Sequence, residues 1–300
     1  MSADYILQQL FNALSVGGEY ALLALGLAIV FSVMGLVNFA HGDLITVGGY
    51  AMFLAVAIGF GNPLLVLPWG ILATVLFALL LERVAFKPVR NAPPTTGMLT
   101  AFGVSIIIQN TALIFIGTRP QAVPTADWLT QSILIGSVRI PVVQILETAV
   151  TFIAIAALVV LLRTTTIGLA MRAAAKDVMV VRLMGVKANR VILTAFAISG
   201  FLAGLAGVFL LARRGAVDPF MGFAPVLKAF VAAVLGGFGS LPGAVVGGFA
   251  LGFAEVALQA TLPSHVAGFR DAFVFLIVGV VLLMRPQGFL GQKPDFGEKS

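Results

Sequence analysis

The chain has 300 residues, of which 60% are hydrophobic and 10% are charged, and its mean hydropathy is +1.09. This composition excludes a water-soluble globular protein and indicates an integral membrane protein. The net charge of +6 is assigned to loops that face the cytoplasm and its anionic lipids, so no nucleic-acid partner is expected.

Nine apolar segments follow one another along the chain. Their lengths suit membrane-spanning helices, which need about 20 residues each, and they lack the alternating pattern of outer-membrane barrel strands. The sequence therefore predicts an all-α, polytopic bundle of about eight or nine transmembrane helices, some of them interrupted, in a single domain over residues 1–300. The segments are 6–36, 44–60, 64–81, 98–116, 142–162, 191–211, 223–241, 244–260 and 272–284.

The basic residues predict the orientation of these helices. Residues 83–90 and 163–190 are basic and are expected in the cytoplasm, whereas residues 119–141 are less basic and are expected outside. This order places the N-terminus outside and the C-terminal tail inside. Arg213 and Arg214 then fall on the outer side, against the rule.

Glu19 and Glu255 are the carboxylates most expected to lie within apolar segments. Glu19 lies in the first and Glu255 in the eighth. Burying a charge in a membrane is costly, so an acid there is a candidate for carrying a proton or lining a cavity. A structural role, in which each acid bonds to a neighbouring helix or stays solvated near the outer surface, is an equally good reading.

Polar residues and glycines gather in residues 35–43, where the first apolar segment meets the second. Asn38 and Asp43 are good N-cap residues, so one helix can end and another begin there. Asn38, His41 and Asp43 are therefore candidates for a helix break beside a translocation path; an ordinary turn at the inner face is the alternative. No metal site is expected, because His41 and Asp43 have no further ligands at a usable spacing.

The most informative stretch is residues 163–190, a sizeable basic loop in a chain that is otherwise nearly all membrane. Residues 168–184 at its core predict a short helix between two spans, placed to touch another protein.

Glycine-rich residues 236–252 are similar in kind to residues 35–49, which suggests a two-fold internal repeat. Transporters often carry such repeats, with interrupted helices that expose backbone groups to the substrate. Gly236, Gly237 and Gly239 are therefore candidates for the same path. Three other glycine pairs are assigned to close helix packing: Gly200 and Gly204, Gly243 and Gly247, and Gly248 and Gly252.

Nothing in the sequence supports an enzyme or a bound cofactor. The phosphate-binding pattern G-x-x-x-x-G-K-S/T is absent. Energy for uphill transport would therefore come from an ion gradient or from another subunit.

Three motifs resemble the branched-chain amino-acid permeases of ABC importers, in particular the H-type member of the permease pair. The motifs are residues 35–43 with the following Gly48-Gly49-Tyr50, residues 172–186, and residues 227–244. The resemblance implies an inner-membrane permease that works with a second homologous permease, two cytoplasmic ATPase subunits that bind ATP and Mg, and a periplasmic substrate-binding protein. Whether the permease core is a heterodimer or a homodimer stays open.

The resemblance also implies that the basic loop is the coupling segment for the ATPase subunits. The candidate coupling residues are Arg172, Lys176, Asp177, Arg182 and Gly185. Gly185 is expected to end the coupling helix, and Asn189 to cap the next span. The segment lacks the glutamate-alanine-alanine and later glycine found in many other ABC importers, so the docking residues do not follow from those importers.

The substrate does not follow from the family alone, because similar permeases are associated with urea, short amides and other amino acids. A mostly apolar path with few polar side chains suits an aliphatic amino acid. A different class of protein, a carrier coupled to protons or sodium through Glu19, Asp43 or Glu255, is also consistent with the sequence.

Overall fold

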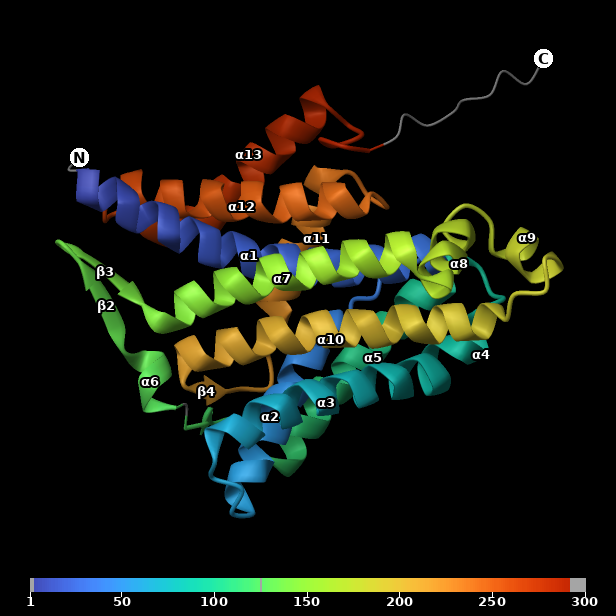
Figure 1. The fold of residues 1–300 in the computed structure, drawn as a ribbon, viewed down its shortest axis with the longest axis horizontal. Coiled ribbons are helices and arrows are strands. Elements are labelled where there is room, and N and C mark those ends of the chain that lie inside the picture. Colours follow the sequence, from blue (N-terminus) through green and yellow to red (C-terminus); the bar gives the residue numbers. More distant parts are fainter. Residues whose placement is uncertain (1–2, 125, 292–300) are drawn as a thin grey trace.

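Long helices form most of the computed structural model, which describes residues 3–124 and 126–291 (Figure 1). Seven of its helices are long and apolar enough to cross a membrane, and two apolar helices, α2 and α11, are shorter. The predicted all-α, polytopic fold is confirmed. The helices are α1 (Ala3–Met34), α2 (His41–Ala57), α3 (Pro63–Leu81), a π-helix (Glu82–Phe86), α4 (Lys87–Val89), α5 (Pro94–Phe115), α6 (Asp127–Thr130), α7 (Val142–Thr164), α8 (Thr166–Ala174), α9 (Val178–Leu183), α10 (Ala188–Arg214), α11 (Phe223–Gly236), α12 (Leu241–Thr261), a 3₁₀-helix (Ala267–Phe269) and α13 (Arg270–Met284).

Four short strands lie in the connections between helices. The strands β2 (Ser132–Ile135) and β3 (Val138–Pro141) form an antiparallel hairpin before α7. The two-residue strands β1 (Gln121–Ala122) and β4 (Ala216–Val217) pair with each other and join the connections after α5 and α10.

Helices α1 and α10 end in the same way. Gly35 follows α1 with φ +68° and donates its N–H to the Phe31 carbonyl at 2.7 Å. Gly215 follows α10 with φ +71° and donates to the Leu211 carbonyl at 2.8 Å. Glycine adopts this left-handed conformation at little cost, and so ends the helix. A short helix then begins within eight residues of each glycine.

Helix packing shows that the chain contains an inverted repeat. The four helices α1, α2, α3 and α5 correspond in order to α10, α11, α12 and α13. α1 packs along α12, and its counterpart α10 packs along α3. In the same way, α2 packs on α3 and α10, and its counterpart α11 packs on α12 and α1. α1 and α10 are antiparallel, because Met34 at the end of α1 lines a cavity with Ile192 near the start of α10.

The repeat differs from the predicted one in its boundaries. The counterpart of residues 35–49 is the stretch 215–229, and not the glycine-rich stretch 236–252, which leads from the end of α11 into α12. The prediction compared glycine content, whereas the structural correspondence rests on the helix end at Gly35 and Gly215 and on the short helix that follows each of them.

The glycine pairs bring helices together, as predicted. A Cβ atom on Gly248 would lie 2.4 Å from the Ala21 backbone, and one on Gly252 would lie 2.4 Å from the Gly17 backbone, so α12 lies directly against α1. The remaining pairs make similar contacts: Gly200 with Val75 and Ala78, Gly204 with Ile71, Gly243 with Gly236, and Gly247 with Ala232.

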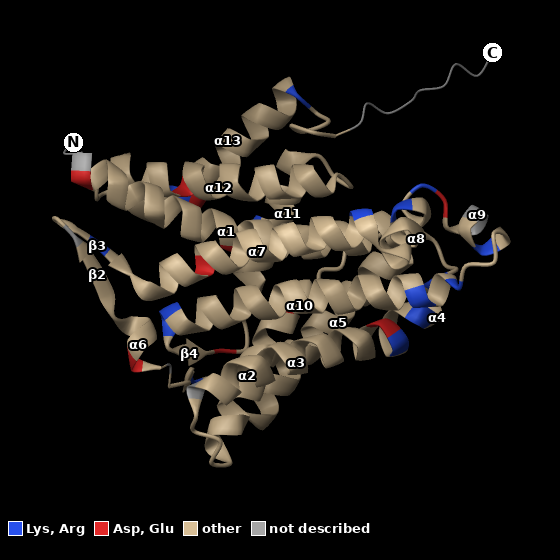
Figure 2. Ribbon diagram, in the orientation of Figure 1, with Lys and Arg blue, Asp and Glu red and all other residues tan. Residues whose placement is uncertain are grey.

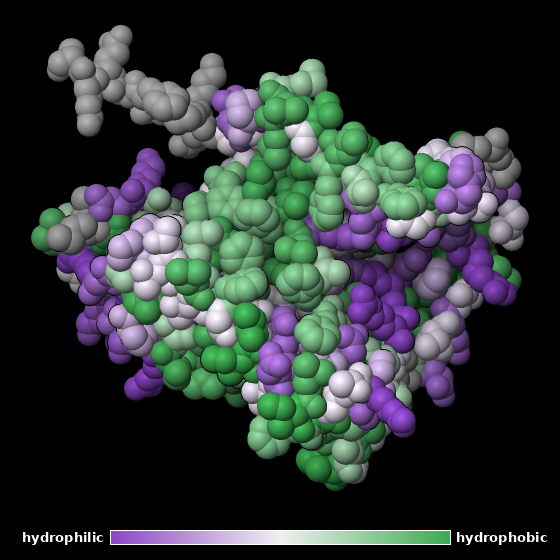
Figure 3. All heavy atoms as spheres, turned by 180° about the vertical axis from the view of Figure 1, so that it is seen from behind, coloured by the Kyte–Doolittle hydropathy of each residue, from purple (hydrophilic) through white to green (hydrophobic). Residues whose placement is uncertain are grey.

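The two ends of the bundle differ in their charged residues. Figure 2 shows basic residues around α4, α8 and α9 at one end, called the basic end here, and the N-terminus and the β2–β3 hairpin at the other, called the hairpin end. On the face seen in Figure 3, hydrophilic side chains gather at both ends and mainly hydrophobic ones lie between them. The N-terminus and the basic loops thus lie at opposite ends, as the predicted orientation requires.

The predicted coupling segment forms two helices rather than a single one. α8 ends at Ala174 and α9 starts at Val178. Asp177 directly precedes α9, the position at which Asp favours the start of a new helix. Gly185 follows α9 with φ +81°, so its predicted role as a helix stop is confirmed.

Candidate translocation and coupling site

α2 begins inside the bundle, between α1 and α10. The His41 side chain is fully buried, and its Nδ1 lies 3.1 Å from Ser199 Oγ on α10. A Cβ atom on Gly26 of α1 would lie 2.6 Å from the His41 ring, so glycine leaves the room that the ring occupies. Gly26 lies eight residues before the end of α1, which is about 12 Å along the helix. The chain therefore breaks and restarts within the bundle, which favours the predicted helix break over a turn at the inner face.

The start of α11 meets the start of α2. A Cβ atom on Gly222 would lie 1.8 Å from the Gly42 carbonyl oxygen, and the Gly222 N–H donates to Thr46 Oγ1 at 3.2 Å. With 17 and 14 residues, α2 and α11 are about 25 and 21 Å long, shorter than the hydrocarbon core of a membrane. Their N-termini carry partial positive charge from free N–H groups, and half-helix ends of this kind attract anionic groups of a substrate in transporters.

Polar side chains surround the start of α2. Asp43 accepts a hydrogen bond from Gln109 on α5 at 3.0 Å, and Gln109 also donates to Ser105. Asn38 is 2% exposed, and among the described residues its side-chain oxygen and nitrogen have no hydrogen-bond partner. Leaving such groups unpaired is costly, so their concentration here marks a place with spare capacity for polar contacts. The structure thus brings Asn38, His41 and Asp43 together, and their role on a path stays a prediction.

The expected capping by Asn38 or Asp43 is wrong. Ala40 precedes α2 and no side chain caps the helix; the His41 N–H donates to the Asn38 carbonyl at 3.2 Å instead. Asp43 lies in the first turn and bonds to α5. Asn189 does not cap α10 either, because it is the second residue of that helix, and its side chain accepts a hydrogen bond from Arg90 at 2.5 Å. The side chains of Asp43 and Asn189 thus bond to other segments of the chain instead of capping a helix.

Gly236, Gly237 and Gly239 lie at the other end of α11, at the basic end of the bundle. Gly236 packs on the Gly243 backbone, and Gly237 has φ +108° and packs on the Gly291 backbone. Gly239 lines a cavity of about 570 Å³. These glycines therefore close the turn from α11 to α12, and their place on a path stays a prediction.

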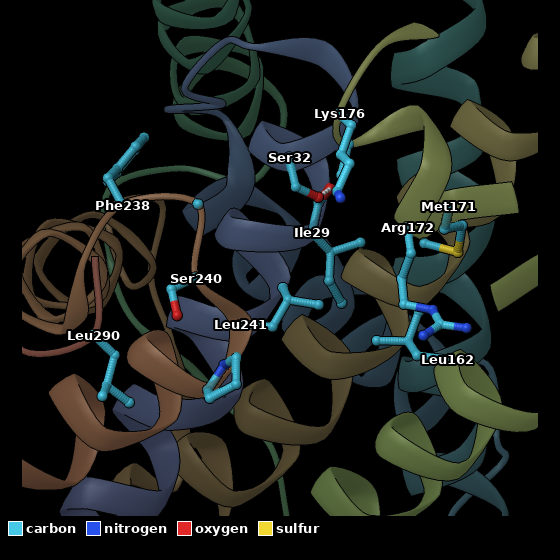
Figure 4. A pocket seen from close by; sticks show the side chains of 13 residues that line it. Ile29, Ser32, Leu162, Met171, Arg172, Lys176, Phe238, Ser240, Leu241 and Leu290 are labelled. Carbon is cyan, nitrogen blue, oxygen red and sulfur yellow. Dashed lines mark hydrogen bonds between the residues drawn. The ribbon is translucent and has the colours of Figure 1, made fainter. Parts of the chain in front are cut away.

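Two predicted coupling residues line the same cavity. Figure 4 shows Arg172 and Lys176 lining it together with Ile29 and Ser32 of α1 and with Ser240 and Leu241 at the start of α12. Arg182 lies apart, in a separate cavity of about 260 Å³ that it lines with Arg90 and Val178.

Both intramembrane acids are paired with cations from other helices. Arg213 forms ion pairs with Glu19 on α1 and, at 2.5 Å, with Glu147 on α7. This pairing accounts for an arginine at the hairpin end that breaks the charge rule. Arg214 lies 3.8 Å from Asp218.

Glu255 lies at the centre of a second cluster. It accepts hydrogen bonds from Tyr20 at 2.7 Å and from Lys228 at 2.8 Å, and it forms an ion pair with Arg270 at 3.1 Å. Among the described residues, no group of three metal-ligating side chains occurs.

Sequence reasoning missed Glu147, Lys228 and Gln109. A signal was available for the first two, because each is a charged residue within a predicted apolar segment. Gln109 also lies within a predicted apolar segment, but it carries no charge, and its contact with Asp43 is what distinguishes it.

Replacing Asn38 or His41 by leucine is expected to impair flux more than assembly. Among the described residues, Asn38 makes no side-chain hydrogen bond that leucine would break, and His41→Leu removes the contact with Ser199 Oγ. Transport measured in proteoliposomes, relative to the amount of chain incorporated, tests this. Asn110→Leu, a matched change on the exposed face of α5, is the control. Normal flux in both variants would show that this segment is a turn without a role on a path.

Comparisons with known proteins fit this arrangement. Residues 9–284 match the family described as the branched-chain amino acid transport system permease component. The chain is 37% identical to the high-affinity branched-chain amino acid transport system permease protein LivH of Salmonella typhimurium, over 96% of each chain. It is 36% identical to BraD of Pseudomonas aeruginosa, again over 96% of each. The ribose import permease protein RbsC of Escherichia coli is 24% identical over 93% of this chain and 85% of its own length.

Proposed function

Since the chain belongs to the family of permease components of branched-chain amino acid transport systems, we propose that it is the H-type permease subunit of an ATP-driven importer for branched-chain amino acids in the bacterial inner membrane. The observation that carries this proposal is the meeting of α2 and α11 at Gly42 and Gly222. Two half-helices whose positive ends meet inside a bundle suit the transient binding of a carboxylate.

The partners we propose follow from the same family. They are a second homologous permease, two cytoplasmic ATPase subunits that bind ATP and Mg, and a periplasmic substrate-binding protein. Arg172 of α8 and Arg182 of α9 are exposed at the basic end, which supports this end as the docking surface for the ATPase subunits. The chain itself then hydrolyses no ATP and binds no cofactor; it transmits the movement of its partners.

Aromatic side chains support an aliphatic substrate. Phe39, which precedes α2, lies 5.9 Å from Phe230, and Phe230 lies 5.6 Å from Phe238, between ring centroids. Phe238 lines the cavity at the basic end. The series therefore leads from the start of α2 to that cavity and offers an apolar surface to a hydrophobic side chain.

Purification from the native membrane in mild detergent tests the proposal. Two ATPase chains and a second permease are expected to co-purify, and leucine-loaded binding protein is expected to stimulate ATP hydrolysis by the complex. Stimulation by a urea-loaded or amide-loaded binding protein, with none by the leucine-loaded one, would contradict the substrate. Transport by the isolated chain in a pH gradient would contradict the importer and establish an ion-coupled carrier.

A further inference from the structure

A groove between α7 and α12 reaches the outer surface of the bundle. Both helices pack on α1, and the buried Leu25 of α1 lines the groove between them. The groove encloses about 540 Å³ and is called the α7–α12 groove here. Val159 on α7 and Val246 on α12 also line it and are 42% and 44% exposed, so the groove opens on the side of the bundle.

The wall of this groove is apolar over most of its length. Apart from Arg163 and Arg172, every residue that lines it is aliphatic. Towards the hairpin end, the stacked rings of Phe152 and Phe249 join α7 to α12, with 5.6 Å between ring centroids. From Ile155 to Arg163 the groove follows α7 for eight residues, or about 12 Å. This length is close to one leaflet, which is half of a hydrocarbon core of about 30 Å.

At the basic end the groove continues into the cavity of about 570 Å³ that Arg172 and Lys176 line. Four residues line both spaces (Figure 4): Leu162, Arg172, Leu241 and Pro242. An apolar groove open to the side of the bundle therefore leads to a polar space at the membrane surface.

The cations at this junction are not neutralised by the chain. Arg163, Arg172 and Lys176 are exposed, and within the described ranges no carboxylate lies at ion-pair distance from any of them. Ser240 and Leu241 at the start of α12 line the same cavity, so the positive end of that helix adds to the attraction for an anion. Basic pockets between membrane helices on the cytoplasmic side bind the headgroups of anionic lipids.

The apolar wall favours an acyl chain over another membrane helix. Close packing of two helices in a membrane uses small residues at the contact, as Gly248 and Gly252 of α12 do against α1. Among the residues that line the α7–α12 groove there is no Gly, Ala, Ser or Thr. A flexible acyl chain can lie along branched side chains without such a close approach. A phospholipid with a net negative headgroup supplies both the chain and the charge in one molecule.

We propose that an anionic phospholipid of the inner leaflet binds here, with an acyl chain in the α7–α12 groove and its headgroup at Arg163 and Arg172. Lys176 adds positive charge on the side of the cavity. The headgroup then links α8, which carries Arg172, to the end of α7. The site goes beyond the proposed function, because it depends on the charge and the apolar surface of this chain and not on the substrate that is carried.

Photo-crosslinking tests this site in the complex as it is purified from the membrane. The complex is placed in vesicles that contain either phosphatidylglycerol or phosphatidylcholine with the same diazirine-labelled acyl chain, and the labelled peptides are identified by mass spectrometry. Phosphatidylglycerol is expected to label residues 155–162 of α7 and 245–246 of α12 at least about fivefold more than phosphatidylcholine, which is the effect of one cation near an anionic lipid.

A double variant tests the headgroup contacts. Arg163→Gln together with Arg172→Gln is expected to lower the ratio of phosphatidylglycerol to phosphatidylcholine labelling to about one, because the two lipids differ in the charge of their headgroups. Arg83→Gln together with Arg285→Gln removes the same charge from exposed positions outside the groove and should leave the ratio unchanged.

A second variant tests the apolar part of the site. Val246→Trp places a large side chain in the opening of the α7–α12 groove and is expected to lower the labelling of α7 by phosphatidylglycerol several-fold. Val280→Trp on α13 is the matched control, because Val280 is 47% exposed and Val246 is 44% exposed. Neither change forces a large side chain into the core, so both variants should fold.

Three results would each overturn the proposal. The first is equal labelling of α7 and α12 by the two lipids, and the second is an unchanged ratio in the Arg163 and Arg172 variant. The third is the absence of lipid labelling on α7 and α12 in the complex, which is the result expected if another subunit covers the groove.

Discussion

Gly222→Ala is expected to prevent stable folding of the chain. The added Cβ would lie 1.8 Å from the Gly42 oxygen and 2.4 Å from its carbonyl carbon, and both are backbone atoms that cannot rotate away. α2 and α11 would have to separate, and overpacking of this kind costs about 1–3 kcal/mol even where the structure can adjust. Yield in the membrane and the temperature of unfolding in detergent should both fall sharply.

Gly103→Ala is the matched control. Gly103 lies within α5, and a Cβ atom there would meet nothing within 4 Å. The same replacement of glycine by alanine is therefore tested without a steric clash, and within a helix it is itself expected to be stabilising. If the two variants unfolded at the same temperature, the close approach of α2 and α11 would not be a feature of the folded protein.

Reversing the charges of Arg172, Lys176 and Arg182 to glutamate is expected to abolish transport while ATP hydrolysis by the complex continues. The three side chains are exposed at the basic end, and the first two line the cavity that separates α8 from α1 and α12. Glutamate at these positions replaces the positive charges that we propose transmit the movement of the ATPase subunits, while the ATP sites lie on those subunits. Uptake and ATP hydrolysis, measured on the same proteoliposomes, distinguish uncoupling from loss of the protein.

The control for this variant carries the same change in charge at the same end. Arg83, Lys87 and Arg285 are exposed there and lie outside the coupling segment. Their reversal to glutamate should leave coupling nearly intact, and it controls for an altered orientation in the membrane. Equal uncoupling by both triple variants, or by neither, would remove α8 and α9 from the coupling mechanism.

Properties that depend on short stretches of sequence were predicted well. The apolar segments correspond to the long helices and to α2 and α11, because hydrophobic length is a local property. Gly185 was assigned correctly as a helix stop, since a left-handed residue after a helix favours glycine. The same reasoning failed for Asn38 and Asn189, because each position also depends on helices distant in sequence.

The inverted repeat shows why a similar local pattern is insufficient. Gly42 lies seven positions after Gly35, just as Gly222 lies seven positions after Gly215. In glycine content, however, the stretch 236–252 is the more conspicuous match to residues 35–49. Only the packing of α1 on α12 and of α10 on α3 identifies the corresponding units. The two halves of this inverted repeat share their helix packing rather than their residue types.

The sequence by itself determined that the protein lies in a membrane, how many apolar helices it has, where its basic loops lie and which family it resembles. Tertiary structure alone decided that α2 and α11 meet at Gly42 and Gly222, that Glu147 and Glu19 share Arg213, and that Lys228 reaches Glu255. The physical reason is that hydropathy, charge bias and helix ends act over a few neighbouring residues. Ion pairs and close backbone contacts instead join residues far apart in the chain, and packing brings them together.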